Sequence, residues 1–537
     1  MNNLLIGINA KYIHPNMAIR LLKANAFFPV EIKEWTIKDK PQIIANYLLA
    51  NSYTLIGFSC YIWNIELIKE VLLLLKQNKF RGKIILGGPE VSYENEEFFD
   101  IYSVDYIIVD EGEIAFHLLL KAIYENSSLQ DIPNLHTKNF KNSSVYIKNL
   151  DLLANPYFDL DFPNQIMYLE TSRGCPFKCS YCMASLEARV RYFNLDIVKK
   201  NLAYLFSKGA KTFKFLDRTF NIDIARAKDL FTFIINNAPL CSSFQFEIVA
   251  DLLTSDLINY LNENVPKGLF RFEIGIQSLN ETTNLLVGRK QNKKTLLDNI
   301  KLIESKKIID LHLDLIAGLP NENLNEFKKS FDEVINLRPL ELQLGFLKLL
   351  KGTRIYLEAS KYNYKWQKKA PFEIIENSVL KAYELEIIRI VENVCEKYYN
   401  SHFMDKTIHY LLDQEKSSFD FFYRFGTFYQ SSYAWFGYNL HDLFIRLYEY
   451  LKNNNPNHEY ILFLMKQDYL AYFNIKPMIW WNRLSKNIYN KRVEILSKTK
   501  LSNFSLQEIF LYGHVEEYGE NGILVLYKLL EKQTFVW

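Results

Sequence analysis

The stretch Met167–Ala184 reads M-Y-L-E-T-S-R-G-C-P-F-K-C-S-Y-C-M-A, and it holds half of the six cysteines of the chain. Cys175, Cys179 and Cys182 stand in the spacing Cys-x-x-x-Cys-x-x-Cys. An apolar run begins the stretch and predicts a strand that leads into a loop. Three thiolates on one short loop can bind three irons of a 4Fe–4S cluster, because such clusters require soft thiolate ligands. One iron then stays open for a ligand that is not a protein side chain.

Two other common uses of clustered cysteines fit this stretch less well. A disulfide framework needs an oxidising compartment and usually an even set of well-separated cysteines. A structural zinc site needs a fourth cysteine or histidine at usable spacing, whereas the nearest histidines, His136 and His312, are distant in sequence. The spacing therefore favours an iron–sulfur cluster with an open position.

The cysteine spacing, with the aromatic Tyr181 just before the last cysteine, resembles the signature of the radical S-adenosylmethionine (SAM) superfamily. The resemblance implies that the open iron binds SAM and that the reduced cluster cleaves it to a 5′-deoxyadenosyl radical. It also implies a small-molecule substrate and an electron donor such as flavodoxin or ferredoxin. In such enzymes the cofactors carry the difficult chemistry, and the protein positions them.

Length and composition describe a globular protein of several domains. The 537 residues exceed what one hydrophobic core accommodates. The net charge of +3 is close to balance and gives no reason to expect a nucleic-acid partner. No apolar run reaches the roughly 18 residues of a membrane span, and the first residues lack the pattern of a signal peptide. We therefore expect a cytoplasmic protein, in a reducing compartment that suits the cluster.

Short apolar runs alternate with segments of helical spacing over residues 1–125. The expected strands are Leu4–Asn9, Val30–Ile37, Leu55–Ser59, Lys83–Leu86 and Val104–Val109, and the expected helices are Asn16–Ala26, Pro41–Asn51 and Asn64–Gln77. This alternation predicts an α/β domain, a doubly wound parallel sheet with helices on both faces. Residues 126–165 are polar and irregular, and they predict a linker to the next domain.

Three of these strands end in small or glycine-containing loops, where the ligand crevice of a parallel sheet lies. Turn chemistry alone explains any single loop, but the phrases G-F-S-C-Y-I-W-N, L-G-G-P-E-V-S and V-D-E-G-E together resemble the cobalamin-binding domain of cobalamin-dependent radical SAM enzymes. The resemblance implies a Rossmann-like domain that contacts cobalamin through the strand-end residues Ser59, Gly87, Gly88, Glu111 and Gly112.

The lower axial ligand of the cobalt is not indicated by the sequence. The Asp-x-His-x-x-Gly pattern of other cobalamin proteins is absent from residues 1–125, and its nearest echo, Asp310-Leu311-His312, lacks the glycine. His14 lies just past the first strand, where it could reach the crevice or serve as a hydrogen-bonded loop histidine. We therefore expect cobalamin to bind without its own base on cobalt.

Strand–helix alternation resumes over residues 166–365. The expected strands are Ile166–Glu170, Thr212–Leu216, Gln245–Val249, Leu269–Ile274, His312–Ile316 and Leu342–Phe346. Six such units, with the cysteine loop after the first, resemble the partial (β/α)6 TIM-type barrel of the superfamily. Functional groups are then expected at the carboxyl-terminal rim of the strands.

Four rim side chains match the groups that SAM offers, which are an ammonium, a carboxylate and ribose hydroxyls. Their order resembles the oxygen-independent coproporphyrinogen dehydrogenase and methylthiotransferase branches, and without that match each acid could be a strand-end cap or an ion-pair partner. The resemblance implies Glu247 for the ammonium, Arg289 for a bidentate pair with the carboxylate, and Gln277 and Asp314 for the ribose.

The segment Asp217-Arg218-Thr219-Phe220-Asn221 departs from the family pattern. It follows the second strand, where many members carry Gly-Gly-Glu for the methionine amine. Asp217 could replace that glutamate in SAM binding, or Arg218 could pair with it instead.

Residues 366–537 predict a mainly α-helical, aromatic-rich domain. Glu373–Tyr399 has the apolar spacing of one long helix, and dense aromatic segments follow it. Aromatic residues at helical spacing favour the packing of a helical bundle over an aromatic substrate cage. A domain of this size could nevertheless cap the barrel and select the substrate.

These features together predict a radical SAM enzyme, and first of all a cobalamin-dependent methyltransferase that acts on an unactivated carbon. The alternative is a radical oxidoreductase or rearrangement enzyme in which cobalamin carries electrons or is absent. A non-catalytic sensor of cluster and cobalamin would leave the SAM-binding residues without a purpose. The sequence does not indicate the substrate.

Overall fold

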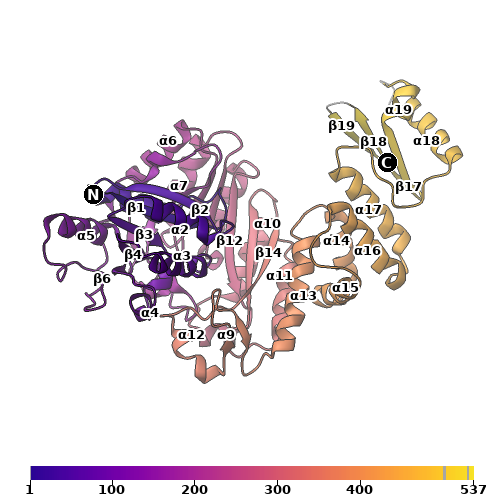
Figure 1. Ribbon diagram of the computed structural model, residues 1–537. Helices are drawn as coiled ribbons and strands as arrows, with labels where there is room; N and C mark the ends of the chain where they lie inside the picture. The colour runs from indigo at the N-terminus through magenta and orange to yellow at the C-terminus, as the bar shows by residue number, and fades with distance from the viewer. Residues whose placement is uncertain (1, 500–503, 529–530) are drawn as a thin grey trace. The chain divides into compact units, whose positions relative to one another are not determined.

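The computed structural model of the protein describes residues 2–499, 504–528 and 531–537. The chain forms two compact units (Figure 1). The first comprises Met1–Ser330, Leu337–Leu340 and Leu344–Ala382, and the second comprises Phe331–Asn336, Glu341–Gln343 and Tyr383–Trp537. Within the described residues, none of the helices has the length and apolar character that crossing a membrane requires.

A six-stranded sheet begins the first unit, in the order β2-β1-β3-β4-β5-β6 (Figure 1). The strands are β1 (Asn3–Asn9), β2 (Glu31–Thr36), β3 (Leu55–Ser59), β4 (Lys83–Gly87), β5 (Tyr106–Ile108) and β6 (Leu135–His136). The first five are parallel, and β6 runs antiparallel to β5. The order 2-1-3-4-5 reverses between β1 and β3, which places the ligand crevice beyond their carboxyl ends. The predicted doubly wound parallel sheet is confirmed.

Helices cover both faces of this sheet. They are α1 (Met17–Ala26), α2 (Pro41–Ala50), α3 (Ile65–Gln77), α4 (Glu96–Asp100) and α5 (Glu113–Glu125). Helices α2 and α3 pack in one apolar cluster, and α1 and α5 pack in another on the opposite face. Every residue of β1 is buried as a result, which explains its continuous apolar run. The predicted linker, residues 126–165, contributes strand β6 to the same sheet.

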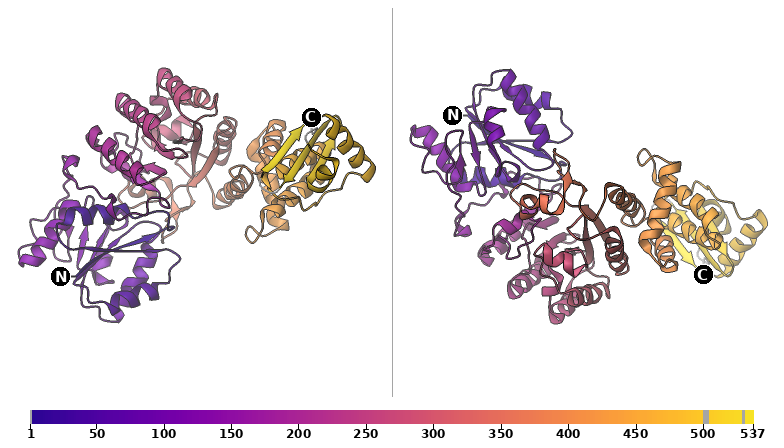
Figure 2. Two further views of the ribbon diagram at one scale, coloured as in Figure 1. Left: turned by 90° about the horizontal axis from the view of Figure 1, so that it is seen from above. Right: turned by 90° about the horizontal axis from the view of Figure 1, so that it is seen from below.

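A second six-stranded sheet follows, in the order β14-β13-β12-β11-β10-β7. Its strands lie at the six predicted places: β7 (Met167–Leu169), β10 (Thr212–Phe215), β11 (Ser243–Glu247), β12 (Phe270–Gln277), β13 (Asp310–Ala317) and β14 (Glu341–Phe346). The helices between them are α6 (Leu195–Ser207), α7 (Ile224–Asn237), α8 (Ser255–Asn264), α9 (Glu281–Leu286), α10 (Lys293–Glu304) and α11 (Leu324–Ile335). The longer of these helices lie on the outer side of the curved sheet (Figure 2), as in a partial barrel.

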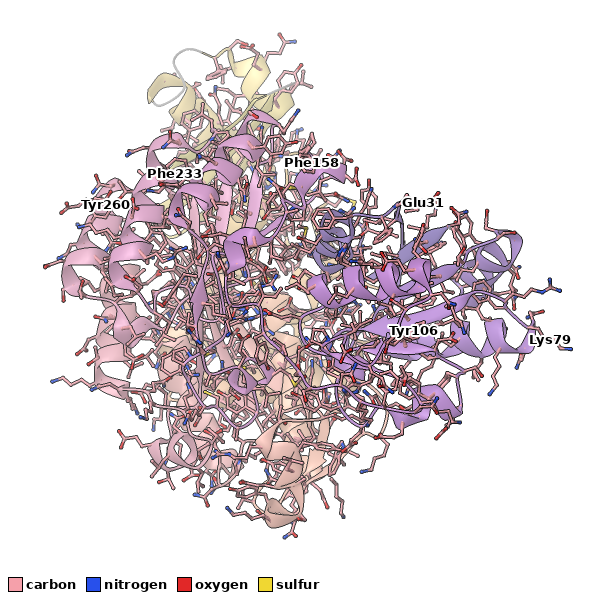
Figure 3. All side chains as sticks on the ribbon, turned by 90° about the vertical axis from the view of Figure 1, so that its left-hand side faces the viewer. Glu31, Lys79, Tyr106, Phe158, Phe233 and Tyr260 are labelled. Carbon is pink, nitrogen blue, oxygen red and sulfur yellow. The ribbon has the colours of Figure 1, made fainter. Side chains whose placement is uncertain are left out.

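Side chains alternate along these strands between an aromatic outer face and a polar inner face. The outer face carries buried phenylalanines that pack under the helices, and Phe231 of α7 lies 5.0 Å from Phe246 between ring centroids. Phe233 and Tyr260 mark the outward surface of α7 and α8 (Figure 3). The alternation leaves Lys214 and Glu273 on the inner face, where they form an ion pair of 3.1 Å. Polar groups are thereby directed to the interior of the barrel.

The segment after β14 completes the first unit with α12 (Arg354–Leu357), β15 (Lys365–Trp366) and β16 (Ile374–Glu376). The long helix predicted over Glu373–Tyr399 is wrong at its start. Its first residues form β16, and α13 spans Ala382–Tyr398. The side chain of Asn377 accepts hydrogen bonds from the amides of Val379 and Leu380, which makes a turn before the helix can begin.

The second unit is mainly helical, as predicted. Its further helices are α14 (Asp405–Gln414), α15 (Ser418–Ser432), α16 (Leu440–Asn454), α17 (His458–Tyr472), α18 (Lys486–Thr499) and α19 (Leu506–Tyr512). The aromatic side chains pack its core: Phe425 is buried and lies 4.9 Å from Tyr398 between ring centroids. Packing therefore accounts for the buried members of these aromatic segments.

The second unit ends in a three-stranded antiparallel sheet that the helical prediction missed. Its strands are β17 (Gly513–Tyr518), β18 (Asn521–Lys528) and β19 (Glu531–Val536). A tight turn joins the first two strands, and Gly519 there has a φ of 59°, in the left-handed region that suits glycine. The apolar run Ile523–Leu526 is buried and supplies the core of this sheet.

Candidate functional site

The cysteine loop is framed by a small hairpin. Strand β8 (Ser172–Arg173) pairs antiparallel with β9 (Arg191–Tyr192), and the loop lies between them. The amide of Cys175 donates to the carbonyl of Glu187 at 2.9 Å. Gly174 has a φ of 90°, and a Cβ there would lie 2.3 Å from the carbonyl oxygen of Arg189. Only glycine fits this entry to the loop.

The three cysteines of the loop are free thiols close to one another. Burial first of all, and then the nearby Cys182 and Cys179, raise the pKa of Cys175 to about 11. In the part of the chain that the structure describes, no three His, Cys, Asp or Glu side chains converge on a single ion. A zinc site requires such convergence, whereas a cluster gives each thiolate its own iron. The donor set therefore fits a cluster better than one metal ion.

Arg289 reaches the cysteine loop from the segment after α9. Its Nη1 lies 3.9 Å from Cys179 Sγ and 3.5 Å from Tyr181 Oη. Its Nη2 donates to the carbonyl of Gly275 at the end of β12. The amide of Ser180 also donates to the carbonyl of Val287 at 2.7 Å, so the loop is tied to the segment that precedes Arg289. The predicted SAM-binding arginine is thus placed beside the predicted cluster.

Gln277 converges on the same place as Arg289. Its φ of 67° accompanies a register shift between β12 and β13, and this bulge redirects the side chain. A Cβ on Gly275 would meet Gln277 Nε2 at 2.2 Å and Arg289 Nη2 at 3.9 Å. Gln277 Oε1 is buried and, among the described residues, accepts no hydrogen bond. An open acceptor beside a guanidinium fits a ligand that carries both hydroxyl and carboxylate groups.

Glu247 is paired with an arginine of the chain, and Asp314 with a histidine. Arg218 forms an ion pair with Glu247, and Asp314 Oδ1 lies 2.9 Å from His312 Nε2. Burial raises the pKa of Glu247, while Arg218 opposes that rise. An ammonium that binds Glu247 would share the carboxylate with Arg218 or displace it.

Asp217 anchors the start of the cysteine loop. Its carboxylate accepts hydrogen bonds from the amide of Thr171 at 3.0 Å, from Thr171 Oγ1 at 2.6 Å and from Ser172 Oγ at 2.6 Å. Asp217 is almost completely buried. The alternative in which Arg218 pairs with Asp217 is wrong, because Arg218 pairs with Glu247. SAM binding by Asp217 stays a prediction, since three protein donors already use its oxygens.

A cavity of about 950 Å³ opens at the carboxyl ends of the first sheet and extends to the barrel. All five predicted cobalamin-contact residues line it: Ser59, Gly87, Gly88, Glu111 and Gly112. Gly88 has a φ of 113°, and a Cβ there would lie 2.5 Å from the carbonyl oxygen of Cys60. Residues of the barrel line the other side, among them Tyr168, Lys214 and Arg218. The cavity therefore belongs to both domains.

The two side chains among the five strand-end residues that can form hydrogen bonds, Ser59 and Glu111, already have protein partners. Ser59 Oγ accepts from Asn16 Nδ2 at 2.7 Å. Glu111 accepts from Arg173 at 3.0 Å and from both terminal nitrogens of Arg191 at 3.0 and 2.8 Å. Burial opposes its ionisation, but the hydrogen bonds from Arg191 and the charge of Arg173 outweigh burial and lower the pKa of Glu111. Glu111 is thus an ion-pair residue in the wall of the cavity.

The sequence interpretation missed aromatic residues that line the same cavity. Tyr61 and Trp63 follow β3, and their rings stack with centroids 4.4 Å apart and an interplanar angle of 6°. The available signal was position, because Tyr61 and Trp63 follow a parallel strand at the crevice edge. His14, which the sequence already put near the crevice, lines the cavity as well and lies 2.7 Å from Tyr168 Oη through Nδ1.

Family models agree with this arrangement. A model described as the radical SAM superfamily matches residues 169–334, and one described as a B12 binding domain matches residues 4–120. The chain is a radical SAM protein with an N-terminal B12-binding domain. The cofactors of these domains are a 4Fe–4S cluster and SAM for the radical SAM domain and cobalamin for the B12-binding domain. A third model, described as a protein of unknown function (DUF4080), matches residues 360–516 of the radical SAM protein.

Curated relatives of this radical SAM protein include two methyltransferases. An uncharacterized methyltransferase of Pyrococcus horikoshii is 27% identical over 300 residues, which cover 51% of this chain and 62% of the relative. The 2-(S-pantetheinyl)-carbapenam-3-carboxylate methyltransferase of Streptantibioticus cattleyicolor is 22% identical over 321 residues, or 52% of this chain and 44% of the relative. The matches thus span less than two thirds of the length of these relatives.

Solved structures share the fold. The cobalamin-dependent SAM radical enzyme OxsB, with aqua-cobalamin and SAM bound, superposes with a TM-score of 0.60 at 14% identity and covers 94% of this chain and 81% of its own. The radical SAM methyltransferase TsrM of Kitasatospora setae, with cobalamin and a [4Fe-4S] cluster bound, gives a TM-score of 0.55 at 15% identity over 67% of this chain and 75% of its own.

Proposed function

We propose that the protein is a cobalamin-dependent radical SAM methyltransferase that acts on an unactivated carbon of a small molecule. The observation that supports this most directly is the single cavity shared by the two cofactor-binding domains. Loops after β1, β3, β4 and β5 line one side of it, and β7, β8 and β10 line the other. A group bound at the sheet edge is therefore next to the domain that binds SAM, and methyltransferases among the relatives support the same reaction class.

When bound, the reduced cluster supplies the electron that cleaves SAM to methionine and a 5′-deoxyadenosyl radical, which takes a hydrogen atom from the substrate, and methylated cobalamin supplies the methyl group. Cys175, Cys179 and Cys182 would each bind one iron. Cys175 and Cys179 are only 8% and 6% exposed, so the protein shields the cluster side from solvent. Shielding limits side reactions of the radical with water.

Residues around Gly275 would bind SAM. The two terminal nitrogens of Arg289 can pair with the carboxylate, and Gln277 Oε1, which accepts no hydrogen bond from the residues that the structure describes, can accept one from a ribose hydroxyl. Glu247 would bind the ammonium in exchange for part of its contact with Arg218. Asp314, held by His312, would remain as a second ribose contact.

We further propose a small-molecule substrate, a reductant such as flavodoxin or ferredoxin, and a reducing compartment such as the cytoplasm. The six free cysteines support the last point, because an oxidising compartment favours disulfides. The reductant follows from the reaction, which needs one electron for each cleavage of SAM.

The test uses anaerobic protein reconstituted with iron, sulfide and cobalamin, and SAM whose methyl group carries deuterium. The protein is incubated with a reductant and small-molecule extracts, and mass spectrometry measures 5′-deoxyadenosine and labelled products. We expect both. Formation of 5′-deoxyadenosine without label in any product would favour an oxidoreductase or a rearrangement enzyme. No 5′-deoxyadenosine at all would contradict radical chemistry and favour a sensor. The Cys179→Ala variant provides the background.

A further inference from the structure

Arg173, two residues before the first loop cysteine, binds carboxylates of both domains. Its Nη1 donates to Glu111 at 3.0 Å and its Nη2 donates to Glu113 at 2.6 Å. Glu111 ends the loop after β5 and Glu113 begins α5, so both belong to the B12-binding domain. The same guanidinium pairs with Glu170 at the end of β7 at 2.9 Å. Arg173 thus joins the two domains directly at the cysteine loop.

A second arginine reinforces this contact. Arg191 lies opposite Arg173 in the pairing of β8 with β9. It forms a bidentate pair with Glu111 and a further ion pair with Glu187 in the cysteine loop. The carboxylate of Glu111 therefore bridges both strands of the hairpin that frames the loop. Bidentate arginine pairs add geometric specificity to their strength.

The groups in this contact are buried, so water screens them little. The side chains of Arg173, Glu111 and Glu113 are 11%, 10% and 6% exposed. Four carboxylates, those of Glu111, Glu113, Glu170 and Glu187, surround two arginines. Without Arg173, the carboxylates of Glu113 and Glu170 would repel each other, while Glu111 would keep its pair with Arg191. Loss of this one cation therefore acts to push the two domains apart.

We propose that Arg173 is a positioning residue that fixes the B12-binding domain against the cysteine loop through Glu111 and Glu113. We call these three residues the arginine clamp. Arg173 lies two residues before Cys175, and Glu111 lines the cavity, so the clamp lies next to both predicted cofactor sites. A displacement of either side would change the separation of the two metal cofactors. This consequence for the cofactors rests on the proposed function, whereas the clamp itself rests on the contacts.

Hydrogen exchange of the cluster-loaded full-length protein tests the clamp without any need for cobalamin. In Arg173→Met we expect the amides of residues 109–116 and 172–192 to exchange together, about tenfold or more faster, because charge-assisted hydrogen bonds are lost from both segments. Glu113→Gln should reproduce part of the effect, and the double variant should add little to Arg173→Met. Arg173→Lys keeps the positive charge but loses the several donors of the guanidinium. This variant replaces Arg173→Met in the experiment if Arg173→Met does not fold.

The matched control is Arg20→Met. Arg20 is equally buried and pairs with Glu34 at 2.6 Å, but both residues lie in the B12-binding domain. We expect this variant to leave exchange in residues 172–192 unchanged. Unchanged exchange of the cysteine loop in Arg173→Met and Arg173→Lys, or fully additive effects with Glu113→Gln, would overturn the clamp.

A second readout separates positioning from a general structural role. Cob(II)alamin and the reduced cluster are both paramagnetic, and the cluster speeds the electron-spin relaxation of cob(II)alamin according to their separation. We expect the iron content of Arg173→Lys to stay at the wild-type level. The relaxation rates of its cob(II)alamin should cover a wider range than those of wild type and of Arg20→Met. Wild-type relaxation in Arg173→Lys would overturn the clamp. Absence of any bound cob(II)alamin in wild type would contradict the proposed function, and hydrogen exchange would then still decide the clamp.

Discussion

His14 Nδ1 and Tyr168 Oη lie 2.7 Å apart, which links the loop after β1 to strand β7 of the barrel. Both residues line the cavity between the two domains. A hydrogen bond to one ring nitrogen fixes the orientation and tautomer of an imidazole. The sequence left open whether His14 reaches the crevice or serves as a hydrogen-bonded loop histidine. In the structure His14 does both.

We expect His14 to be neutral at pH 7. Burial lowers its pKa below the usual value, and the positive charges of Lys11 and Lys214 lower it further. Because the folded state disfavours the proton, His14 contributes stability that is present above pH 6.5 and is lost as the pH falls below that value. NMR of ring-labelled histidines, with His14→Gln for assignment, should show a titration below pH 6.5. A midpoint at or above that of free histidine would contradict the environment described.

Cys179→Ala should abolish the visible iron–sulfur absorbance and the cleavage of SAM. The substitution removes one of three thiolate ligands, and the remaining two cannot hold a cluster that has one open iron. Iron and sulfide analysis after anaerobic reconstitution measures the loss. Cys241→Ala is the control, because Cys241 is exposed and lies outside the loop. Full cluster content in Cys179→Ala would refute this ligation.

Arg289→Lys should weaken SAM binding about tenfold or more, because the lysine cannot replace a bidentate, charge-assisted pair with a carboxylate. Titration of SAM into the cluster-loaded protein gives the dissociation constant. Lys290→Met, next in sequence and exposed, should bind as wild type does. Equal affinity in Arg289→Lys would place the carboxylate site elsewhere.

Local patterns predicted the sheets and the cysteine loop. The barrel strands are short segments that mostly carry apolar side chains at alternate positions, and Cys175–Cys182 carry their chemistry within eight residues, so neither depends on distant partners. The sequence did not predict which side chains form hydrogen bonds or ion pairs with residues far away in the chain. Asp217 accepts its hydrogen bonds from residues 45 and 46 positions earlier, and Arg173 finds Glu113 60 positions earlier. Sequence spacing shows that such groups exist but not which of them meet.

The missed sheet at the end of the chain has a different cause. Residues 513–536 follow a series of aromatic-rich helices, and the apolar run Ile523–Leu526 is short enough to suit a helix or a strand. Only the turn at Gly519 and the antiparallel pairing of β17 with β18 decide between them. The buried charge on β17, Glu516, also has no signature in the sequence.

Glu516→Gln should destabilise the second unit by about 3 kcal/mol, because it leaves a buried lysine without its counter-ion. Glu516 is 1% exposed. It pairs with Lys466 at 2.7 Å, accepts from Trp481 Nε1 at 2.6 Å and lies 2.8 Å from His514 Nε2. Urea unfolding of the full chain, followed by tryptophan fluorescence, measures the change. A loss below about 1 kcal/mol, the range of exposed pairs, would contradict the buried pair.

The pH dependence gives Glu516→Gln a second signature. Burial opposes ionisation of Glu516, but the hydrogen bond from His514 and the charge of Lys466 outweigh it and lower its pKa. A lowered pKa contributes stability that is present above the unfolded value of about 4.3 and is lost as the pH falls through the folded value. The gap between wild type and Glu516→Gln should therefore be full at pH 7 and shrink below about pH 4. Glu494→Gln removes an exposed pair with Lys498 and should change the unfolding free energy by less than about 0.5 kcal/mol at either pH.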